Sequence, residues 1–382
     1  MTESPAHPRQ LRAVEADLVP AALADALAGG DPIAPLPEAG TERRHTLDVL
    51  QLDRPVVEPD AAAVVVTSGS TGRPKGVVLS RSAIAASATA THRRLGGPGD
   101  WVLALPPQHV AGLMVLARCA VAGTTAHRVD SHLVGLSRAA AGMRGRRYLS
   151  LVPTQLVRAC RDKELSATLA GFDAVLVGGA AVDPELLAGA ARRRIKVVTS
   201  YGMSETCGGC VYDGVPLDGV TVDLEPGTQR ILLGGPTLFS GYRLQPGLSA
   251  AARRAGRFLT SDRGVWDEDR LTVLGRLDDV VISGGINVDL AAVERAAGSW
   301  PGLDGAEIAV LAVPDPEWGA QVVAVTDGSG ALADLRRYLG SQLPAAAAPR
   351  RLVEVAVLPR TPSGKIDRQR LIADLAALDS DR

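Results

Sequence analysis

The chain has 382 residues, 46% of them hydrophobic, and its 41 basic and 42 acidic residues give a formal net charge of -1. This length suggests more than one domain, and the balanced charge gives no indication of nucleic-acid or anionic-lipid binding. The start lacks the basic and apolar segments of a secretory signal, and the most apolar stretch, residues 102–123, is too interrupted to span a membrane. We therefore expect a cytoplasmic protein.

The first predicted elements are a valine-rich strand at residues 61–66, a Gly/Ser/Thr loop and a helix over residues 81–95. The order of strand, loop and helix recurs between residues 174 and 199. Alternating strands and helices predict a largely parallel sheet with loops gathered at the strand ends, where ligands bind.

After Gly214 the pattern changes to short strand-like runs with frequent glycine and proline, which predict an antiparallel β region. A mixed order returns from about residue 279. The elements expected there are a helix at 290–297, strands near 306–313 and 321–325, and a helix at 332–339. We predict an α/β and α+β architecture with a large N-terminal domain, residues 1–277, and a small mobile α+β domain, residues 278–382.

The strongest motif follows the first predicted strand and is the run Thr67-Ser68-Gly69-Ser70-Thr71-Gly72-Arg73-Pro74-Lys75-Gly76. Glycines let backbone N–H groups approach an anion, and hydroxyls and Lys75 add further favourable contacts. A Walker A loop is excluded, because Pro74 precedes the lysine and Gly76 follows it. Lysine is rare in this chain, occurring at positions 75, 163, 196 and 365 only. The run therefore predicts a phosphate-binding loop, with a flexible linker as the alternative.

Further motifs follow in order along the chain. They are Gly178-Gly179-Ala180-Ala181, Tyr201-Gly202-Met203-Ser204-Glu205-Thr206, the run GRFLTSD ending at Asp262, Gly275-Arg276-Leu277-Asp278-Asp279, Ser283-Gly284-Gly285-Ile286-Asn287-Val288 and Pro362-Ser363-Gly364-Lys365-Ile366-Asp367. Together with the phosphate-binding loop they resemble the motifs of the adenylate-forming superfamily, which includes acyl-CoA synthetases, peptide-synthetase adenylation domains and luciferases. The resemblance begins at about Ala61, so an N-terminal subdomain of the family is expected to be trimmed or absent.

The resemblance implies that most of these residues bind ATP and Mg²⁺. By resemblance, Tyr201 would stack on adenine and Glu205 would hold the Mg²⁺. The chemistry fits these roles, since an aromatic face can stack on a base and a carboxylate suits a hard cation. Asp262 would bind the ribose hydroxyls, with Ser261 in place of the usual glycine before it. The other implied nucleotide-binding residues are Thr67, Ser68, Gly69, Ser70, Thr71, Gly72, Lys75, Gly178, Gly179, Ala180, Gly202, Ser204 and Arg276.

The resemblance also implies two successive reactions in one pocket. Lys365, presented by a Pro-Ser-Gly turn, would be the principal catalytic residue of acyl-AMP formation, and Glu205 would act with it. Asp278 would be the hinge for a movement that brings the loop at Gly284 and Gly285 in for reaction with coenzyme A. A solvent-exposed lysine in a terminal turn is the alternative for Lys365.

Two further stretches, residues 103–123 and 204–219, are similar to actinobacterial-type o-succinylbenzoate–CoA ligases of menaquinone biosynthesis. His109 would be a catalytic or acyl-pocket residue, although a structural histidine is an alternative. Gly208 and Gly209 would leave room for an aryl ring, and Arg118 would pair with a second substrate carboxylate.

The resemblance implies ATP, Mg²⁺, coenzyme A and a small carboxylic acid as ligands, with 2-succinylbenzoate the favoured acid. One alternative is an acyl- or aryl-acid adenylating enzyme of a natural-product pathway that delivers to a carrier protein or an amine. Another is a non-catalytic adenylate-binding protein. The sequence leaves a homodimer open.

Overall fold

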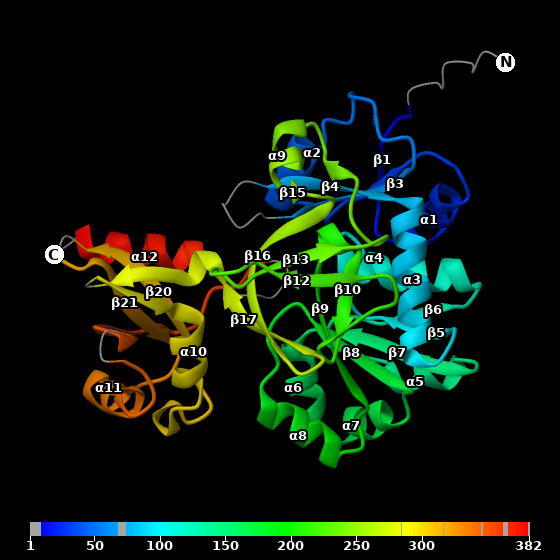
Figure 1. Ribbon diagram of the computed structural model, residues 1–382. Helices are drawn as coiled ribbons and strands as arrows, with labels where there is room; N and C mark the ends of the chain where they lie inside the picture. The colour runs from blue at the N-terminus through cyan, green and yellow to red at the C-terminus, as the bar shows by residue number, and fades with distance from the viewer. Residues whose placement is uncertain are drawn as a thin grey trace. The chain divides into compact units, whose positions relative to one another are not determined.

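The structure is a computed structural model that describes residues 9–67, 74–283, 285–315, 317–344, 347–361 and 366–380. The chain forms two compact units, which Figure 1 shows with their helices and strands labelled. Unit 1 comprises Met1–Asp223, Leu232–Leu259 and Glu268–Leu271, and unit 2 comprises Leu224–Ile231, Thr260–Asp267 and Thr272–Arg382. A functional domain boundary between residues 277 and 278 stays a prediction.

A seven-stranded sheet of order β11-β10-β9-β8-β7-β5-β6 dominates unit 1. Strands β5 to β9 are parallel, and β10 pairs antiparallel with both β9 and β11. The bounds are β5 Gly99–Leu103, β6 Ala126–Arg128, β7 Arg146–Leu151, β8 Ala174–Gly178, β9 Val197–Met203, β10 Gly208–Tyr212 and β11 Val215–Pro216. The predicted, largely parallel sheet is confirmed.

Helices cover both faces of this sheet (Figure 1). On one face, inward-pointing strand residues such as Val102, Leu149 and Val175 form a hydrophobic core with helices α5 to α8. On the other face α4 packs against β5 and β7. Helix α3 contacts this sheet and also a second, five-stranded sheet of the same unit. The bounds are α3 Arg81–Leu95, α4 Val110–Ala122, α5 Leu136–Gly142, α6 Pro153–Arg161, α7 Lys163–Ala170 and α8 Pro184–Arg192.

A five-stranded sheet of order β1-β2-β3-β4-β14 lies in the same unit. Its strands and helices are β1 Arg12–Val14, α1 Val19–Leu27, β2 Ile33–Pro35, α2 Thr41–Leu50, β3 Ala61–Thr67, β4 Lys75–Ser80 and β14 Gly241–Tyr242. Strand β4 was not predicted from the sequence, in which the phosphate-binding loop was expected to lead straight into a helix. The buried run Gly76-Val77-Val78-Leu79 instead pairs antiparallel with β3, with Thr67 opposite Lys75. Such an apolar, β-branched run fits a strand.

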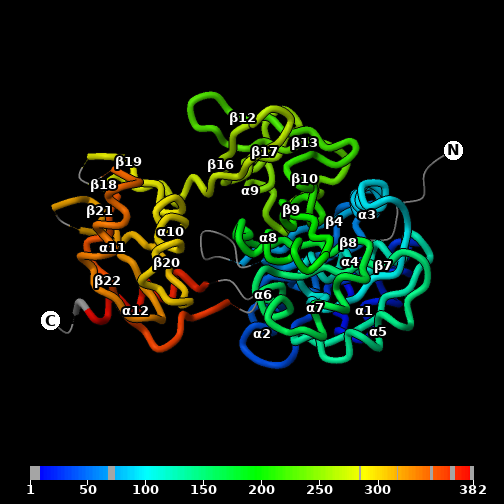
Figure 2. Tube along the Cα trace, turned by 90° about the horizontal axis from the view of Figure 1, so that it is seen from below, coloured from blue at the N-terminus to red at the C-terminus, as the bar shows by residue number. Residues whose placement is uncertain are grey.

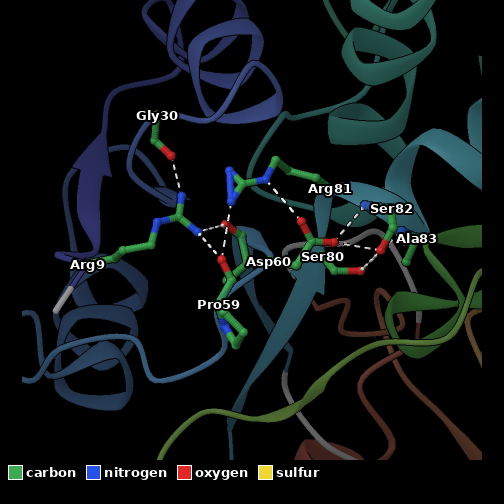
Figure 3. A network of polar contacts seen from close by, with 9 residues as sticks. Arg9, Gly30, Pro59, Asp60, Ser80, Arg81, Ser82 and Ala83 are labelled. Atoms are coloured by element: carbon green, nitrogen blue, oxygen red, sulfur yellow. Dashed lines mark hydrogen bonds and ion pairs between the residues drawn. The ribbon is translucent and has the colours of Figure 1, made fainter. Parts of the chain in front are cut away.

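A polar network joins the loop before β3 to the start of α3 (Figure 3). Asp60 accepts hydrogen bonds from Arg81 Nε at 3.1 Å and from the Ser82 hydroxyl at 2.6 Å. Arg9 donates to the Ala61 carbonyl at 2.7 Å. Burial raises the pKa of Asp60, but the hydrogen bonds from Ser82 and Arg81 outweigh it, so the pKa lies below its ordinary value. The network fixes both ends of the segment that contains β3 and β4.

Arg243, directly after β14, is 3% exposed and should be one of the most important residues for the stability of unit 1. Its guanidinium donates to the carbonyls of Leu50, of Gln51 at 2.8 Å and of Arg54 at 2.6 Å. Arg243→Met is expected to lower the free energy of unfolding by about 3 kcal/mol, because these carbonyls lose a charged donor. Urea denaturation measures this, with Arg192→Met on the exposed face of α8 as control. Equal losses in both variants would contradict the prediction.

The predicted antiparallel β region after Gly214 is present as a sheet of order β12-β13-β16-β15, in which β17 also pairs with β16. Strands β15 and β16 are antiparallel. The bounds are β12 Thr221–Leu224, β13 Arg230–Gly234, β15 Arg253–Arg254, β16 Arg257–Asp267 and β17 Arg270–Arg276, with α9 at Pro246–Ala251.

Unit 2 contains a three-stranded sheet of order β20-β21-β22. Val310 of β20 packs with α10 and α11, while its neighbours Ala309 and Leu311 pack with α12 on the opposite face (Figure 1). Figure 2 shows the hairpin of β18 and β19, from which the chain continues into α10. The bounds are β18 Val280–Ser283, β19 Ile286–Asp289, α10 Leu290–Gly298, β20 Ile308–Asp315, β21 Gly319–Thr326, α11 Leu332–Gly340, β22 Arg351–Glu354 and α12 Arg368–Ser380. The mixed α+β pattern predicted for this region is confirmed.

Within the residues that the structure describes, no helix has both the length and the apolar character that crossing a membrane requires.

Candidate active site

The carboxyl ends of the parallel strands in unit 1 gather several of the predicted residues. Gly178 ends β8 and is followed by Gly179 and Ala180, and Tyr201 lies near the end of β9, the neighbouring parallel strand. His109 is half-buried and immediately precedes α4, in the connection that follows β5. Because parallel strands end at the same edge of a sheet, these residues lie along one edge, where α/β proteins bind their ligands.

The turn that presents Glu205 depends on a close approach of two backbones. Strand β9 leads into a short 3₁₀ turn, Ser204–Thr206, and the chain returns as β10. A Cβ atom on Gly202 would lie 2.1 Å from the carbonyl oxygen of Gly208, so glycine is required there. The Thr206 hydroxyl donates to the same carbonyl at 2.6 Å. The carboxylate is therefore carried by a turn that packing holds in place.

A lysine, a carboxylate and a phenol meet beside the β3–β4 hairpin. Lys75 Nζ lies 3.4 Å from Glu205 Oε1 and donates a 3.0 Å hydrogen bond to the Tyr242 hydroxyl. That hydroxyl donates in turn to Glu205 Oε1 at 2.8 Å. Glu205 is 7% exposed, so the cluster is largely shielded from water. Burial and the neighbouring Glu205 carboxylate raise the pKa of Tyr242 far above its ordinary value, which keeps the phenol protonated as a donor.

Tyr242 is the member of this cluster that was not predicted from the sequence. It pairs with Val77 across β14 and β4, although it lies 167 positions from Lys75 in the chain. Its ring packs against Phe239 with 4.9 Å between the ring centres. The available signal was the pair Gly241-Tyr242 in a chain that has only five tyrosines.

The donor set of this cluster fits a magnesium ion bound together with phosphate. Mg²⁺ is usually held by one or two carboxylates together with substrate phosphates, and Glu205 supplies a carboxylate. Among the described residues, the buried Thr67 Oγ1 has no hydrogen-bond partner. The pairing of Thr67 with Lys75 places both side chains on the same face of the hairpin. A phosphate oxygen there would accept from both groups.

Within unit 2, Arg276 joins the predicted ribose ligand to the predicted hinge. Its Nη1 lies 3.6 Å from Asp262 Oδ1, and its Nη2 lies 2.7 Å from Asp278 Oδ2. The backbone N–H of Asp262 donates to the Thr260 hydroxyl at 3.0 Å. Ser261 lies inside the strand β16, which accommodates serine in the place of the motif's glycine. Asp262 is thereby oriented from both its backbone and its side chain.

Arg118 lies in the interior of unit 1, where it is 3% exposed. Its guanidinium stacks 4.7 Å from the centre of the Trp101 ring, and its Nη2 donates to the Tyr212 hydroxyl at 3.4 Å. Burial, with a smaller contribution from this guanidinium, lowers the pKa of His92 to about 4, so that imidazole is neutral at pH 7. Binding of a substrate carboxylate by Arg118 stays a prediction.

Gly208 and Gly209 open strand β10. A Cβ atom on Gly209 would lie 2.0 Å from the Ser200 hydroxyl oxygen, so the Ser200 side chain fills the space beside this glycine. Room there for an aryl ring stays a prediction.

Gly285 has a φ of 79° directly before β19. The predicted site residues outside the described part of the chain are Ser68, Gly69, Ser70, Thr71, Gly72, Gly284 and Lys365.

Two family models match this chain. One, described as AMP-binding enzyme, matches residues 8–242, and the other, described as AMP-binding enzyme C-terminal domain, matches residues 292–365. The chain belongs to the AMP-binding enzyme family. The models place most of the chain within this family, in agreement with the motifs seen in the sequence.

This AMP-binding enzyme is similar to proteins named as ligases. The Mycobacterium tuberculosis (strain ATCC 25618 / H37Rv) protein "Probable 2-succinylbenzoate–CoA ligase" is 43% identical over 93% of this chain and 94% of that protein. The 2-succinylbenzoate–CoA ligase of Enterococcus faecalis is 30% identical over 87% of this chain and 73% of that protein. A solved structure of wild-type E. coli MenE with a bound m-phenylether-linked analogue of OSB-AMS is 25% identical, with a TM-score of 0.74 over 98% of this chain and 89% of that one.

Proposed function

We propose that this AMP-binding enzyme is a 2-succinylbenzoate–CoA ligase of menaquinone biosynthesis. With ATP it converts a carboxylate of 2-succinylbenzoate to an acyl-AMP with release of pyrophosphate, and coenzyme A then displaces AMP to give the thioester. The observation that carries this proposal is the 43% identity to the M. tuberculosis ligase over 93% of this chain and 94% of the relative. Cytoplasmic location and a homodimer stay predictions.

The cluster of Lys75, Glu205 and Tyr242 supports the adenylation step. Attack of a carboxylate oxygen on the α-phosphorus accumulates negative charge there, which fixed cations and hydrogen-bond donors stabilise. Glu205 would hold Mg²⁺, whose charge would offset that of the phosphates. Lys75 and Thr67 would donate to the phosphate oxygens, and Tyr201 would stack on the adenine, with Gly178–Ala180 beside it.

The remaining roles in this proposal rest on motif resemblance. Asp262 and Arg276 would bind the ribose side of the nucleotide, and the Arg276–Asp278 ion pair lies at the proposed hinge. Lys365 would contact the reacting atoms during adenylation. The loop containing Gly284 and Gly285 would admit coenzyme A for the second reaction.

A panel of carboxylic acids tests the proposed substrate. With ATP and Mg²⁺, 2-succinylbenzoate is expected to support the fastest ATP–pyrophosphate exchange, and addition of coenzyme A should yield its thioester, identified by mass spectrometry. Faster exchange with simple benzoates or fatty acids would contradict the substrate assignment. Product formed only with an amine or a carrier protein would contradict the acceptor assignment. Absence of exchange with every acid would favour a non-catalytic adenylate-binding protein.

A further inference from the structure

One oxygen of the carboxylate proposed to bind the cation already lies beside a positive charge. Glu205 Oε1 lies 3.4 Å from Lys75 Nζ and accepts the 2.8 Å hydrogen bond of Tyr242. A Mg²⁺ ion coordinated by a carboxylate lies about 2.1 Å from the oxygen that binds it. An ion on this oxygen would therefore lie within a few ångströms of the ammonium, and the two positive charges would repel each other.

Several contacts fix the ammonium beside the carboxylate. Lys75 donates to the Tyr242 hydroxyl at 3.0 Å, and its Nζ also lies 4.2 Å from the centre of the same ring. A cation over an aromatic face is attracted by the ring, most strongly where water is excluded. The side chains of Lys75 and Glu205 are 21% and 9% exposed, so water screens the pair only weakly. The lysine is therefore held as a partner of Glu205.

We infer that Lys75 is a built-in counter-ion of Glu205 that prevents this carboxylate from binding a divalent cation until a nucleotide triphosphate is present. A triphosphate offers the ammonium phosphate oxygens as an alternative partner, and it supplies further ligands for the cation. Movement of Lys75 to the phosphate then frees Glu205 Oε1. The inference rests on the proposed function, since it takes Glu205 as the cation ligand and Lys75 as a phosphate ligand.

Titration of the nucleotide-free protein with Mn²⁺ alone tests this role, with free Mn²⁺ measured by electron paramagnetic resonance. Lys75→Met removes the charge and keeps a side chain of similar length, so it should bind Mn²⁺ at least about tenfold more tightly than the wild type. Lys75→Arg retains the charge and should bind as weakly as the wild type. Lys163→Met, at an exposed position at the start of α7, is the matched control and should change nothing.

The location of the added affinity is tested by combining Lys75→Met with Glu205→Gln. The double variant should lose the gain, because the freed carboxylate is what binds the ion. Tyr242→Phe removes the hydroxyl that engages both partners and keeps the ring that packs on Phe239, so a several-fold gain is expected there as well. If circular dichroism and thermal melting show that Lys75→Met does not fold, Tyr242→Phe alone tests the counter-ion role.

Two results separate a failure of this inference from a failure of the proposed function. If the wild type binds Mn²⁺ in the presence of ATP but Lys75→Met and Tyr242→Phe bind Mn²⁺ alone no better than the wild type, the counter-ion role is wrong. If the wild type does not bind Mn²⁺ even with saturating ATP, as followed by water-proton relaxation, then the assignment of Glu205 as cation ligand fails and the proposed function loses its metal site.

Discussion

Lys365→Ala should slow formation of the acyl-adenylate by about a hundredfold or more, while conversion of supplied acyl-AMP to the thioester is largely retained. The reason lies in where charge develops in each reaction. During adenylation, negative charge gathers around the α-phosphorus, and an ammonium placed there stabilises the transition state. During thioester formation the sulfur attacks the acyl carbon, so a cation at the phosphate contributes less.

Single-turnover measurements distinguish the two reactions. Rapid quenching with radiolabelled ATP gives the adenylation rate, and synthetic acyl-AMP with coenzyme A gives the rate of the second reaction. Lys163→Ala, at another of the few lysines, is the matched control and should leave both rates unchanged. Equal losses in the two reactions would contradict a role of Lys365 in adenylation alone, because the substitution would then lower both rate constants and not that of one transition state.

Regular elements were predictable where local signals agree with one another. The helix expected at residues 81–95 is observed as α3 with the same bounds, and its ends show why. The Ser80 hydroxyl accepts from the backbone N–H of Ala83, and Gly96 adopts a left-handed conformation with a φ of 93°. Such capping residues are visible in the sequence as start and stop signals.

The features that could not be predicted depend on contacts between distant segments. Tyr242 joins Lys75 only because β14 pairs with β4, and no local pattern specifies that pairing. The sequence analysis assigns Arg118 as the partner of a second carboxylate on the substrate. Its observed contacts, the Trp101 ring and the Tyr212 hydroxyl, come from two separate strands. Stacking of a cation on a ring requires no fixed spacing in sequence, so the sequence carries no signal for it.

Glu205→Gln is the prediction that most directly tests the site seen in the structure. Glutamine keeps the size of the side chain and can still accept the hydrogen bond of Tyr242, but it lacks the charge that binds a cation. We expect kcat/KM to fall by about a hundredfold or more and half-maximal rate to require much higher Mg²⁺ concentrations.

The stability of the Glu205→Gln variant decides between a chemical and a structural role for the carboxylate. Lys75 keeps its hydrogen bond to Tyr242 and is partly exposed, but the pair is poorly screened by water, so the free energy of unfolding should fall by about 2 kcal/mol. Turnover as a function of Mg²⁺ concentration, measured beside a urea denaturation curve, gives both quantities on the same preparation. Glu185→Gln, at an exposed position in the first turn of α8, is the control that should alter neither. A loss of activity that disappears once it is corrected for the unfolded fraction would show that Glu205 serves the fold, since a cation ligand must change the Mg²⁺ dependence of the folded enzyme itself.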